Sequence, residues 1–199
     1  MDDALSLLND RIWRDLHAVA SKGTPAPAWQ NMVLSTTDLN GVPQSRMVVL
    51  RDADVDRRRI FFHTDTRSPK WEQMQKRPTV SLLVYDSERR EQLRLTGKAM
   101  LHAPGDLLQN SVWNALSAWT RTTYCGGPPG HVKGAPVPQD VLYEAPTTSE
   151  TEPGRSVFGV VEVQVASQDW YQHPRGDIQR AVFDFSSDGR VASARWIAP

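Results

Sequence analysis

The sequence predicts a mainly β fold with flanking helices (α+β), built around a closed or nearly closed antiparallel barrel. Two neighbouring strand-like runs support this prediction most directly. Residues 79–85 (TVSLLVY) form a compact run rich in apolar side chains, whereas residues 91–101 alternate polar and apolar side chains. One strand buried on both faces beside another buried on one face is typical of an antiparallel barrel.

The segment 43–70 predicts a strand over residues 45–51, a charged turn over 52–59, a second strand over 60–64, and then a helix. The helix is expected to begin at Ser68-Pro69 and to reach about residue 76, where Arg77-Pro78 ends it. The Ser68 hydroxyl can accept a hydrogen bond from the first-turn amides, and Pro69 suits the first helical position.

The start of this helix gathers groups that hold a phosphate. Free amides and the helix dipole attract an anion there, and the hydroxyls of Thr64 and Ser68 and the ammonium of Lys70 fall at the same point. Forked donors that suit phosphate oxygens come from Arg46, Arg51 and Arg67. Strand–turn–strand–helix units with surface arginines also occur without a phosphate, so both interpretations stay open.

The other elements follow from periodicity and from turn residues. Apolar residues at helical spacing predict amphipathic helices over residues 3–21 and 104–119. Further strands are expected over residues 30–37, 157–165, 178–185 and 191–197. Between them, residues 120–156 form a long Gly/Pro-rich loop without strands. Loops of this length are usually functional or disordered. We expect one domain over residues 1–199.

Composition excludes several classes of function. Lys plus Arg equals Asp plus Glu at 23 each, so no global basic field attracts nucleic acid. The single cysteine, Cys125, cannot form an internal disulfide, and no metal site is expected. No apolar run approaches a membrane span, and the acidic N-terminus lacks the charge of a signal peptide. The expected protein is therefore cytoplasmic and free of the membrane.

Five short motifs within residues 30–102 resemble those of the pyridoxamine 5′-phosphate oxidase family, whose members have the FMN-binding split-barrel fold. The motifs are RMVVLR (46–51), FHT (62–64), SPK (68–70), RPTVSLL (77–83) and EQLRLTG (91–97). Near the end, Trp170 and Arg180 stand ten residues apart, as do the family's C-terminal flavin contacts. The resemblance implies an antiparallel split barrel of six or seven strands that forms a homodimer.

The resemblance also implies an FMN site at the dimer interface. Arg46, Ser68 and Lys70 would hold the phosphate, and Arg51 takes the place of a family lysine near the flavin ring and the substrate. Gln92 would lie near the ring, while Trp170 and Arg180 would come from the partner subunit. The residues assigned to the cofactor are Arg46, Met47, Val48, Val49, Arg51, His63, Thr64, Ser68, Lys70, Gln92, Trp170 and Arg180.

The assignments of Arg46, Arg51 and Trp170 to one flavin site each require a particular structural arrangement. Arg46 and Arg51 are five residues apart, so an unbroken strand sends them to opposite faces. Both reach one cofactor only if the strand twists or bulges, or if the ligand wraps round its end. Trp170 lies among polar residues, where a large ring needs a dimer interface or a ligand to cover it.

Departures from the family pattern concern the substrate more than the cofactor. His63 replaces an aromatic residue, and Pro69 replaces an arginine between the serine and the lysine. Gly176 and Ile178 stand where the oxidases carry an arginine and a histidine that grip their substrate. The sequence therefore resembles an FMN-binding relative more than the vitamin-pathway oxidase itself.

The predicted function is that of an FMN-dependent oxidoreductase acting on an unidentified small molecule, with no catalytic residue assigned. His63 could donate a proton near the flavin, although a lone histidine after two phenylalanines is more often structural. One alternative is a non-catalytic module that binds or senses FMN. Another is a split barrel that uses haem or a deazaflavin.

Overall fold

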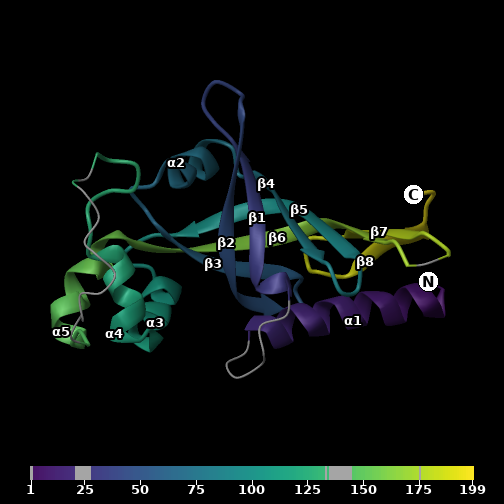
Figure 1. Cartoon of the computed structure of the whole chain (residues 1–199), viewed down its shortest axis with the longest axis horizontal. Helices are drawn as coiled ribbons and strands as arrows, with labels where there is room; N and C mark the ends of the chain where they lie inside the picture. The colour runs from purple at the N-terminus through teal and green to yellow at the C-terminus, as the bar shows by residue number, and fades with distance from the viewer. Residues whose placement is uncertain (1, 21–27, 133, 135–144, 175) are drawn as a thin grey trace.

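The computed structural model describes residues 2–20, 28–132, 134, 145–174 and 176–199, and it is dominated by one antiparallel sheet (Figure 1). The sheet has eight strands in the spatial order β3-β2-β1-β4-β5-β6-β7-β8. They are β1 (Asn31–Thr37), β2 (Pro43–Asp54), β3 (Arg59–Asp65), β4 (Thr79–Asp86), β5 (Glu91–His102), β6 (Phe158–Gln172), β7 (Gln179–Phe185) and β8 (Val191–Trp196).

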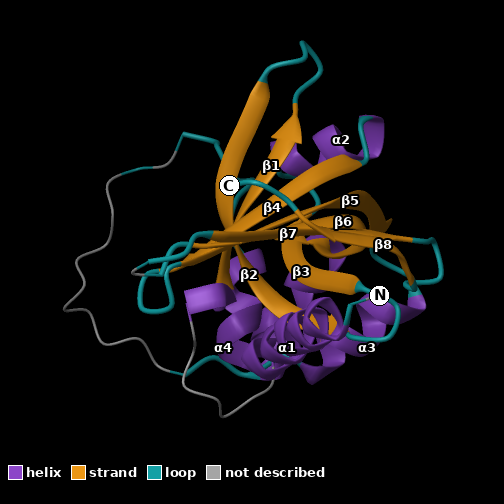
Figure 2. Cartoon of the chain, turned by 90° about the vertical axis from the view of Figure 1, so that its right-hand side faces the viewer, coloured by secondary structure: helices purple, strands orange, loops and turns teal. Residues whose placement is uncertain are grey.

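Six of these strands close into a barrel, because β3 pairs with β6 as well as with β2. Strands β7 and β8 extend the sheet beyond the barrel, on the free edge of the second half of β6. The predicted mainly β fold, an antiparallel split barrel with flanking helices, is therefore confirmed. Figure 2 shows the strands crossing at the centre of the molecule, with most of the helices below them.

The long strand β6 changes its second partner along its length. Residues 158–164 pair with β3 and residues 167–172 pair with β7, while β5 pairs along both halves. The change falls beside an irregularity in the β5–β6 pairing at Gly97. A Cβ at Gly97 would lie only 2.2 Å from the backbone oxygen of Gln164, so only glycine permits this close approach of two strands.

Helix α1 (Asp3–Ala20) packs one apolar face against the barrel, as its periodicity predicts. Its buried side chains are Leu5, Asn9, Ile12, Trp13, Leu16 and Val19. All of them except Asn9 join the main core, which also contains the inward side chains of the barrel strands. Helix α2 (Pro69–Lys76) connects β3 to β4 and lies on the opposite side of the barrel from α1 (Figure 1).

The predicted helix over residues 104–119 is wrong at both ends. Helix α3 (Leu107–Ala115) starts later because the Asp106 side chain accepts hydrogen bonds from the amides of Leu108 and Gln109. It stops at Leu116, whose backbone is extended. Ser117 then caps a separate short helix, α4 (Ala118–Arg121), by accepting a hydrogen bond from the Thr120 amide.

Both ends of the stretch predicted as a long loop, residues 120–156, are helical in the structure. After α4 come the 3₁₀ helix η2 (Thr122–Tyr124), then α5 (Thr148–Thr151) and η3 (Glu152–Val157). Residues 133 and 135–144 lie outside the described part of the chain. Figure 1 shows α3, α4 and α5 grouped at the start of β6, where Trp113, Tyr124, Phe158 and Val160 form a second, smaller core.

Within the residues that the structure describes, none of the helices combines the length and the apolar character needed to cross a bilayer.

Candidate functional site

A bulge in β2 sets the position of Arg51. Leu50 pairs with Phe62 and Asp52 pairs with Phe61, so Arg51 is an extra residue in the β2–β3 ladder. Two consecutive side chains, those of Arg51 and Asp52, therefore lie exposed outside the barrel before Ala53 returns to the core. The bulge places a guanidinium on the outer face of β2, beside the outward side chains of β3.

Arg46 lies on the other face of β2, as its spacing from Arg51 predicts. Its Nη2 donates to Gln73 Oε1 at 3.1 Å, its Nη1 donates to the carbonyl oxygen of Gln44 at 3.1 Å, and Nη1 also donates to Thr36 Oγ1. Burial lowers the pKa of the Arg46 guanidinium. Arg46 is thus held against α2 by Gln73, close enough to Lys70 for its charge to lower the pKa of that residue.

A cavity of about 290 Å³ runs from the start of α2 to the outer face of β2 and β3. Seven of the residues assigned to the cofactor from the sequence line it: Met47, Val48, Val49, Arg51, His63, Thr64 and Lys70. We call this space the β2–α2 cavity. Its remaining lining residues are Asp65, Thr123, Tyr124 and Pro129.

Lys70 supplies a free cation to the β2–α2 cavity, as Arg51 does. Its ammonium makes no hydrogen bond or ion pair with any residue in the described ranges. Burial is the main cause of a lowered pKa for Lys70, the charge of Arg46 lowers it further, and Asp65 opposes the shift. Two neighbouring cations, with the Asp65 carboxylate already paired with Arg67, favour an anion at this place.

Two hydroxyls lie beside Lys70, but not in the predicted roles. The Ser68 hydroxyl does not cap α2. It donates instead to the carbonyl oxygen of Asp65 at 2.6 Å, because the turn before the helix brings that oxygen within reach. Thr64 Oγ1 lies 3.3 Å from Ser68 Oγ, and both side chains are buried. Thr64 Oγ1 also lies 3.4 Å from the carbonyl oxygen of Asp65, so both hydroxyls would have to turn away from this oxygen to donate to a phosphate.

Arg67 is not free to bind a phosphate, which corrects the prediction that it adds a donor. Its guanidinium contacts both carboxylate oxygens of Asp65, with Nη2–Oδ2 at 2.6 Å and Nε–Oδ1 at 3.0 Å. Its Nη2 also donates to the carbonyl oxygen of Gly126 at 3.0 Å. Arg67 therefore ties the chain after η2 to the turn before α2.

His63 enters the β2–α2 cavity as a neutral ring. Burial, with a smaller contribution from the Arg51 charge, lowers its pKa to about 3. The imidazole packs edge-on against Phe158 with ring centroids 5.1 Å apart. Its Nδ1 is buried and has no hydrogen-bond partner among the described residues. At neutral pH, His63 can make a hydrogen bond to a ligand, but it cannot act as a cationic acid.

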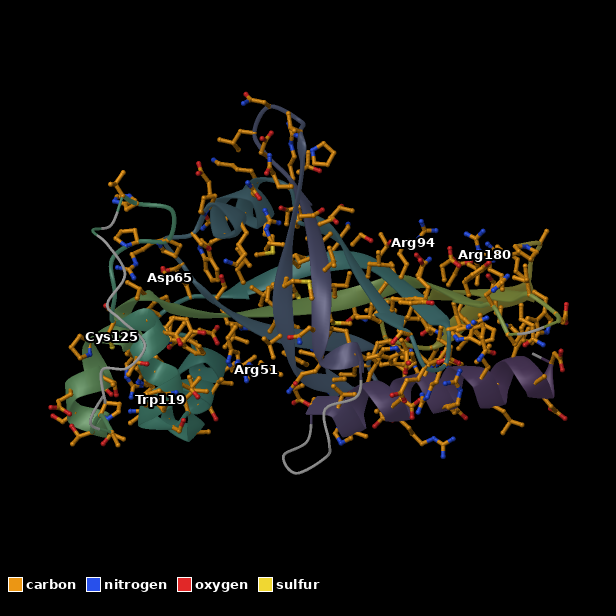
Figure 3. The ribbon with its side chains drawn as sticks, viewed as in Figure 1. Arg51, Asp65, Arg94, Trp119, Cys125 and Arg180 are labelled. Atoms are coloured by element: carbon orange, nitrogen blue, oxygen red, sulfur yellow. The ribbon has the colours of Figure 1, made fainter. Side chains whose placement is uncertain are left out.

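Five of the assigned residues do not line this cavity: Arg46 and Ser68, which contact Gln73 of α2 and Thr64, and Gln92, Trp170 and Arg180, which lie in β5, β6 and β7. Figure 3 shows Arg51 and Asp65 on one side of the barrel and Arg94 and Arg180 toward the other end of the sheet. Gln92 pairs with Tyr171 across β5 and β6, and Tyr171 pairs with Arg180 across β6 and β7. The sequence-assigned residues therefore form two separate groups within one chain.

Trp170 corrects an expectation, because the chain itself covers its ring. The side chain is 2% exposed and belongs to the main core. The guanidinium of Arg11 from α1 lies 6.0 Å from the ring centroid, and Trp196 packs edge-on at 6.4 Å. Of the polar residues near Trp170 in sequence, Asp169 points to the other face of β6, whereas Gln168 shares the face of Trp170 and is itself buried, so the polar sequence gave a misleading signal about its surroundings.

Tyr124, Thr123 and Pro129 line the β2–α2 cavity and were not anticipated. They come from the segment predicted as a Gly/Pro-rich loop, and Tyr124 packs against Phe158 with centroids 4.9 Å apart. Burial raises the pKa of the Tyr124 hydroxyl to about 12, so this group stays protonated at neutral pH. An aromatic residue just before a Gly-Gly-Pro-Pro run was the available signal.

A closed six-stranded antiparallel barrel, with this cavity beside the helix after β3, defines the class of split-barrel proteins. Within that class, residues 10–103 match the family model described as pyridoxamine 5′-phosphate oxidase, FMN-binding domain. The chain is therefore a relative of the pyridoxamine 5′-phosphate oxidase family, and the resemblance read from its motifs is confirmed.

Two solved structures share the fold over nearly the whole chain. A pyridoxamine 5′-phosphate oxidase-related, FMN binding protein from Nostoc punctiforme PCC 73102 has a TM-score of 0.71 and 24% identity, covering 95% of this chain and 96% of the other. PhzG from Burkholderia lata 383, in complex with tetrahydrophenazine-1-carboxylic acid, has a TM-score of 0.66 and 15% identity, covering 100% and 94%.

Curated relatives match over shorter stretches. The pyridoxine/pyridoxamine 5′-phosphate oxidase of Caulobacter vibrioides is 39% identical over 66 residues, which are 33% of this chain and 29% of that enzyme. The corresponding oxidase of Paraburkholderia phymatum is 30% identical over 97 residues, 47% of this chain and 45% of that enzyme. The matches thus span less than half the length of these relatives.

Proposed function

We propose that this protein binds FMN in the β2–α2 cavity and acts as an oxidoreductase on a small molecule. The observation that carries the proposal is the unpaired Lys70 ammonium at the start of α2, beside the Ser68 and Thr64 hydroxyls. A cation, two hydroxyls and a helix N-terminus together suit a terminal phosphate. When bound, FMN would supply the hydride chemistry of its ring.

The chain's own residues would orient the cofactor. The phosphate would lie at Lys70 and Arg46, and the ring would run along the backbone of Met47, Val48 and Val49 toward Arg51. His63 fits the wall of such a site, because its buried Nδ1 lacks a partner and a bound ligand can supply one. The cavity offers one phosphate pocket, which favours a mononucleotide over FAD.

We further propose that the active form is a homodimer, because the second group of assigned residues lies on a face that continues from the cavity. Cross-strand partners share one face of a sheet. On the outer face of the sheet, one row of successive cross-strand partners consists of Met47, Val33, Leu83, Arg94, Asp169 and Val182. The face exposes large side chains, with Met47 59% and Tyr85 56% accessible.

A second copy on this face would bring its Arg180 and Gln92 to the flavin ring. Arg180 and Arg94 share a single carboxylate, that of Asp169, so the cluster keeps a net positive charge that a flavin can use. Trp170 takes no part in this proposal, because its ring lies in the core. The absence of an internal disulfide in the fold fits a cytoplasmic location.

One alternative function is supported by a specific observation. The one histidine lining the β2–α2 cavity is neutral, and the carboxylate there, Asp65, is paired with Arg67. Among the described residues of the cavity, the structure therefore offers no cationic histidine and no unpaired carboxylate. A non-catalytic FMN-binding module would need no proton-exchanging group. Hydride transfer to a flavin can also proceed without such a group.

The test is the absorbance spectrum of the purified protein, with mass analysis of what denaturation releases. FMN should be released, and titration should show tighter binding of FMN than of FAD. A haem or deazaflavin spectrum, or a preference for FAD, would contradict the proposed cofactor. Anaerobic reduction by a reduced nicotinamide then separates an oxidoreductase from a binding module.

A further inference from the structure

Residues 122–131 form one wall of the β2–α2 cavity, and we call this segment the strap. It begins as the 3₁₀ helix η2 and continues through the Gly-Gly-Pro-Pro-Gly run. Thr123, Tyr124 and Pro129 of the strap line the cavity together with residues of β2, β3 and α2. A molecule in this cavity would therefore be enclosed between the strap and the barrel.

The first half of the strap is fixed to the smaller core. The Tyr124 ring packs edge-on against Phe158, with ring centroids 4.9 Å apart. Cys125 Sγ lies 3.5 Å from the carbonyl oxygen of Thr151. A Cβ at Gly154 would lie only 3.1 Å from Tyr124 Cβ, so the lack of a side chain there permits the close packing. This half of the strap is thus held by residues outside the cavity lining.

The second half of the strap depends on Arg67. Arg67 Nη2 donates to the carbonyl oxygen of Gly126 at 3.0 Å, from a position 59 residues away in sequence. Among the described residues, this is the one hydrogen bond or ion pair that joins the strap to the turn between β3 and α2. Beyond Gly126, the described strap makes one further hydrogen bond, from the His131 amide to the Pro128 carbonyl oxygen within its own turn. The contact with Arg67 therefore fixes the part of the strap that carries Pro129.

Asp65 holds the Arg67 guanidinium in the orientation that reaches the strap. Its carboxylate accepts hydrogen bonds from Nε and Nη2 of Arg67, and from the Arg67 backbone amide at 2.8 Å. Asp65 is 8% exposed, so little water competes for these contacts. Figure 3 shows Asp65 and Cys125, the neighbour of Gly126, at the same end of the barrel. One guanidinium thus joins the end of β3 to the strap.

We propose that Arg67 is a positioning residue for the cofactor, because it fastens the strap against the β2–α2 cavity and so slows the escape of a bound flavin. This inference rests on the proposed function, since the flavin is the molecule that the strap retains. Arg67 acts through the strap and not through the phosphate, because its Nε and Nη2 are already engaged by Asp65 and Gly126. Loss of Arg67 therefore affects FMN and riboflavin alike, unlike loss of Lys70.

The first experiment measures flavin release from Arg67→Met by stopped-flow fluorescence, after rapid dilution of the flavin-loaded protein. FMN and riboflavin should both dissociate at least five-fold faster than from the wild type, and by similar factors. Arg77→Met is the matched control and should release both at the wild-type rate. Arg77 also donates to a backbone oxygen, that of Asp38 at 2.9 Å, but neither residue lines the cavity.

Two outcomes of the release experiment overturn the proposal. Release of both flavins from Arg67→Met at the wild-type rate would show that the strap does not retain them. Faster release of FMN alone would place Arg67 on the phosphate instead of on the strap.

The second experiment measures hydrogen exchange by mass spectrometry in flavin-free protein. In Arg67→Met, peptides covering the strap should exchange at least five-fold faster, while peptides of β4 and β5 keep their wild-type rates. Unchanged exchange in the strap, or faster exchange throughout the barrel, overturns the specific role of Arg67. If Arg67→Met does not fold, Arg67→Gln repeats both experiments, because its shorter side chain keeps a donor for Asp65 but does not reach Gly126.

The two experiments separate this inference from the proposed function. If the wild type binds neither flavin but the exchange pattern holds, the flavin function is wrong and the fastening of the strap by Arg67 stands. If FMN binds, and Arg67→Met changes neither flavin release nor exchange in the strap, the flavin function stands and the role of Arg67 is wrong.

Discussion

The guanidinium of Arg180 makes a two-point ion pair with Asp169, with Nε–Oδ1 at 3.0 Å and Nη2–Oδ2 at 2.8 Å. This pair fixes the orientation of Arg180 on the outer face of the sheet, and its planar geometry is the strong form of such a contact. Arg94 shares the same carboxylate. The cluster of Arg94, Asp169 and Arg180 is thus ordered within one chain, without a partner subunit. Whether it serves the flavin site of the partner can be tested by exchanging subunits.

Mixed dimers should recover flavin sites that neither variant has alone. Lys70→Ala removes the phosphate cation from one half of a site, and Arg180→Ala removes the other half. In a mixed dimer, one site carries both defects and the other carries none. Random exchange makes about half of the dimers mixed, so about a quarter of all sites should regain wild-type FMN affinity. Fluorescence titration after subunit exchange measures this.

If Lys70 and Arg180 of the same chain formed one flavin site, subunit exchange would restore no wild-type site. Mixing each variant only with itself is the control. A monomer with full FMN affinity would also contradict the shared site.

Lys70→Ala should weaken binding of FMN far more than binding of riboflavin. The lost interaction is a hydrogen bond to a charged group, so we expect a loss of about 1.5–3 kcal/mol for FMN. Lys76→Ala is the matched control, because Lys76 is an exposed residue at the far end of the same helix. Equal losses for the two ligands would show that Lys70 does not contact the phosphate.

The buried, neutral His63 should make the free energy of unfolding decrease as the pH is lowered. Its folded pKa of about 3 lies below the ordinary value of 6.5, so the unfolded chain binds more protons between these pH values. The contribution of neutral His63 is complete above pH 6.5 and is lost as the pH falls toward 3, at about 1 kcal/mol per pH unit. Urea unfolding of wild type and His63→Phe, without added flavin, gives the difference at each pH.

The stability advantage of the wild type over His63→Phe should therefore shrink between pH 6.5 and 4. His131→Asn, at an exposed position, should run parallel to the wild type over the same range. A constant difference between wild type and His63→Phe would mean that His63 titrates normally in the folded protein.

Gly97→Ala should destabilise the barrel severely. The added Cβ would meet a backbone oxygen at 2.2 Å, which no side-chain rearrangement relieves. We expect a loss of about 3 kcal/mol or more in the free energy of unfolding. Gly126→Ala has no heavy atom within 4 Å of its added Cβ and should change this free energy little. Denaturant midpoints of both variants give the comparison.

The protein should be a poor pyridoxamine 5′-phosphate oxidase. Gly176 and Ile178 stand where the resemblance places the substrate-binding arginine and histidine; Gly176 is exposed, Ile178 is partly buried, and neither carries a cationic side chain. Loss of two contacts made in the transition state costs several kcal/mol. The assay follows pyridoxal phosphate formation by FMN-loaded protein; turnover near 1 s⁻¹ or above, an ordinary enzymatic rate, would contradict the prediction.

Much of the barrel and half of the candidate site could be predicted because their signals are local. Ser68-Pro69 marked the start of α2 to the residue, and the alternation of β5 fixed its faces. The surroundings of Trp170 could not be read, because the residues that cover it, Arg11 and Trp196, are far away in sequence.

Competition between neighbouring polar groups also escaped prediction. Arg67 was available in principle to a phosphate, but Asp65, two residues before it, engages the Nε and Nη2 atoms of the guanidinium. Ser117 splits the helix predicted over residues 104–119, because a serine can cap a new helix as readily as it can continue an old one. Such choices depend on geometry that no spacing rule contains.

The double pairing of β6 has a consequence for biosynthesis. Strands β1 to β5 leave the ribosome before β6, and β6 covers the edges of both β3 and β5. Until residues 158–172 emerge, the barrel is incomplete, and one edge of β3 and one edge of β5 lack their β6 partner. Open strand edges recruit other chains, so aggregation during translation is greatest in that interval. The emergence of β6, rather than helix formation, then limits when the edges of β3 and β5 become covered.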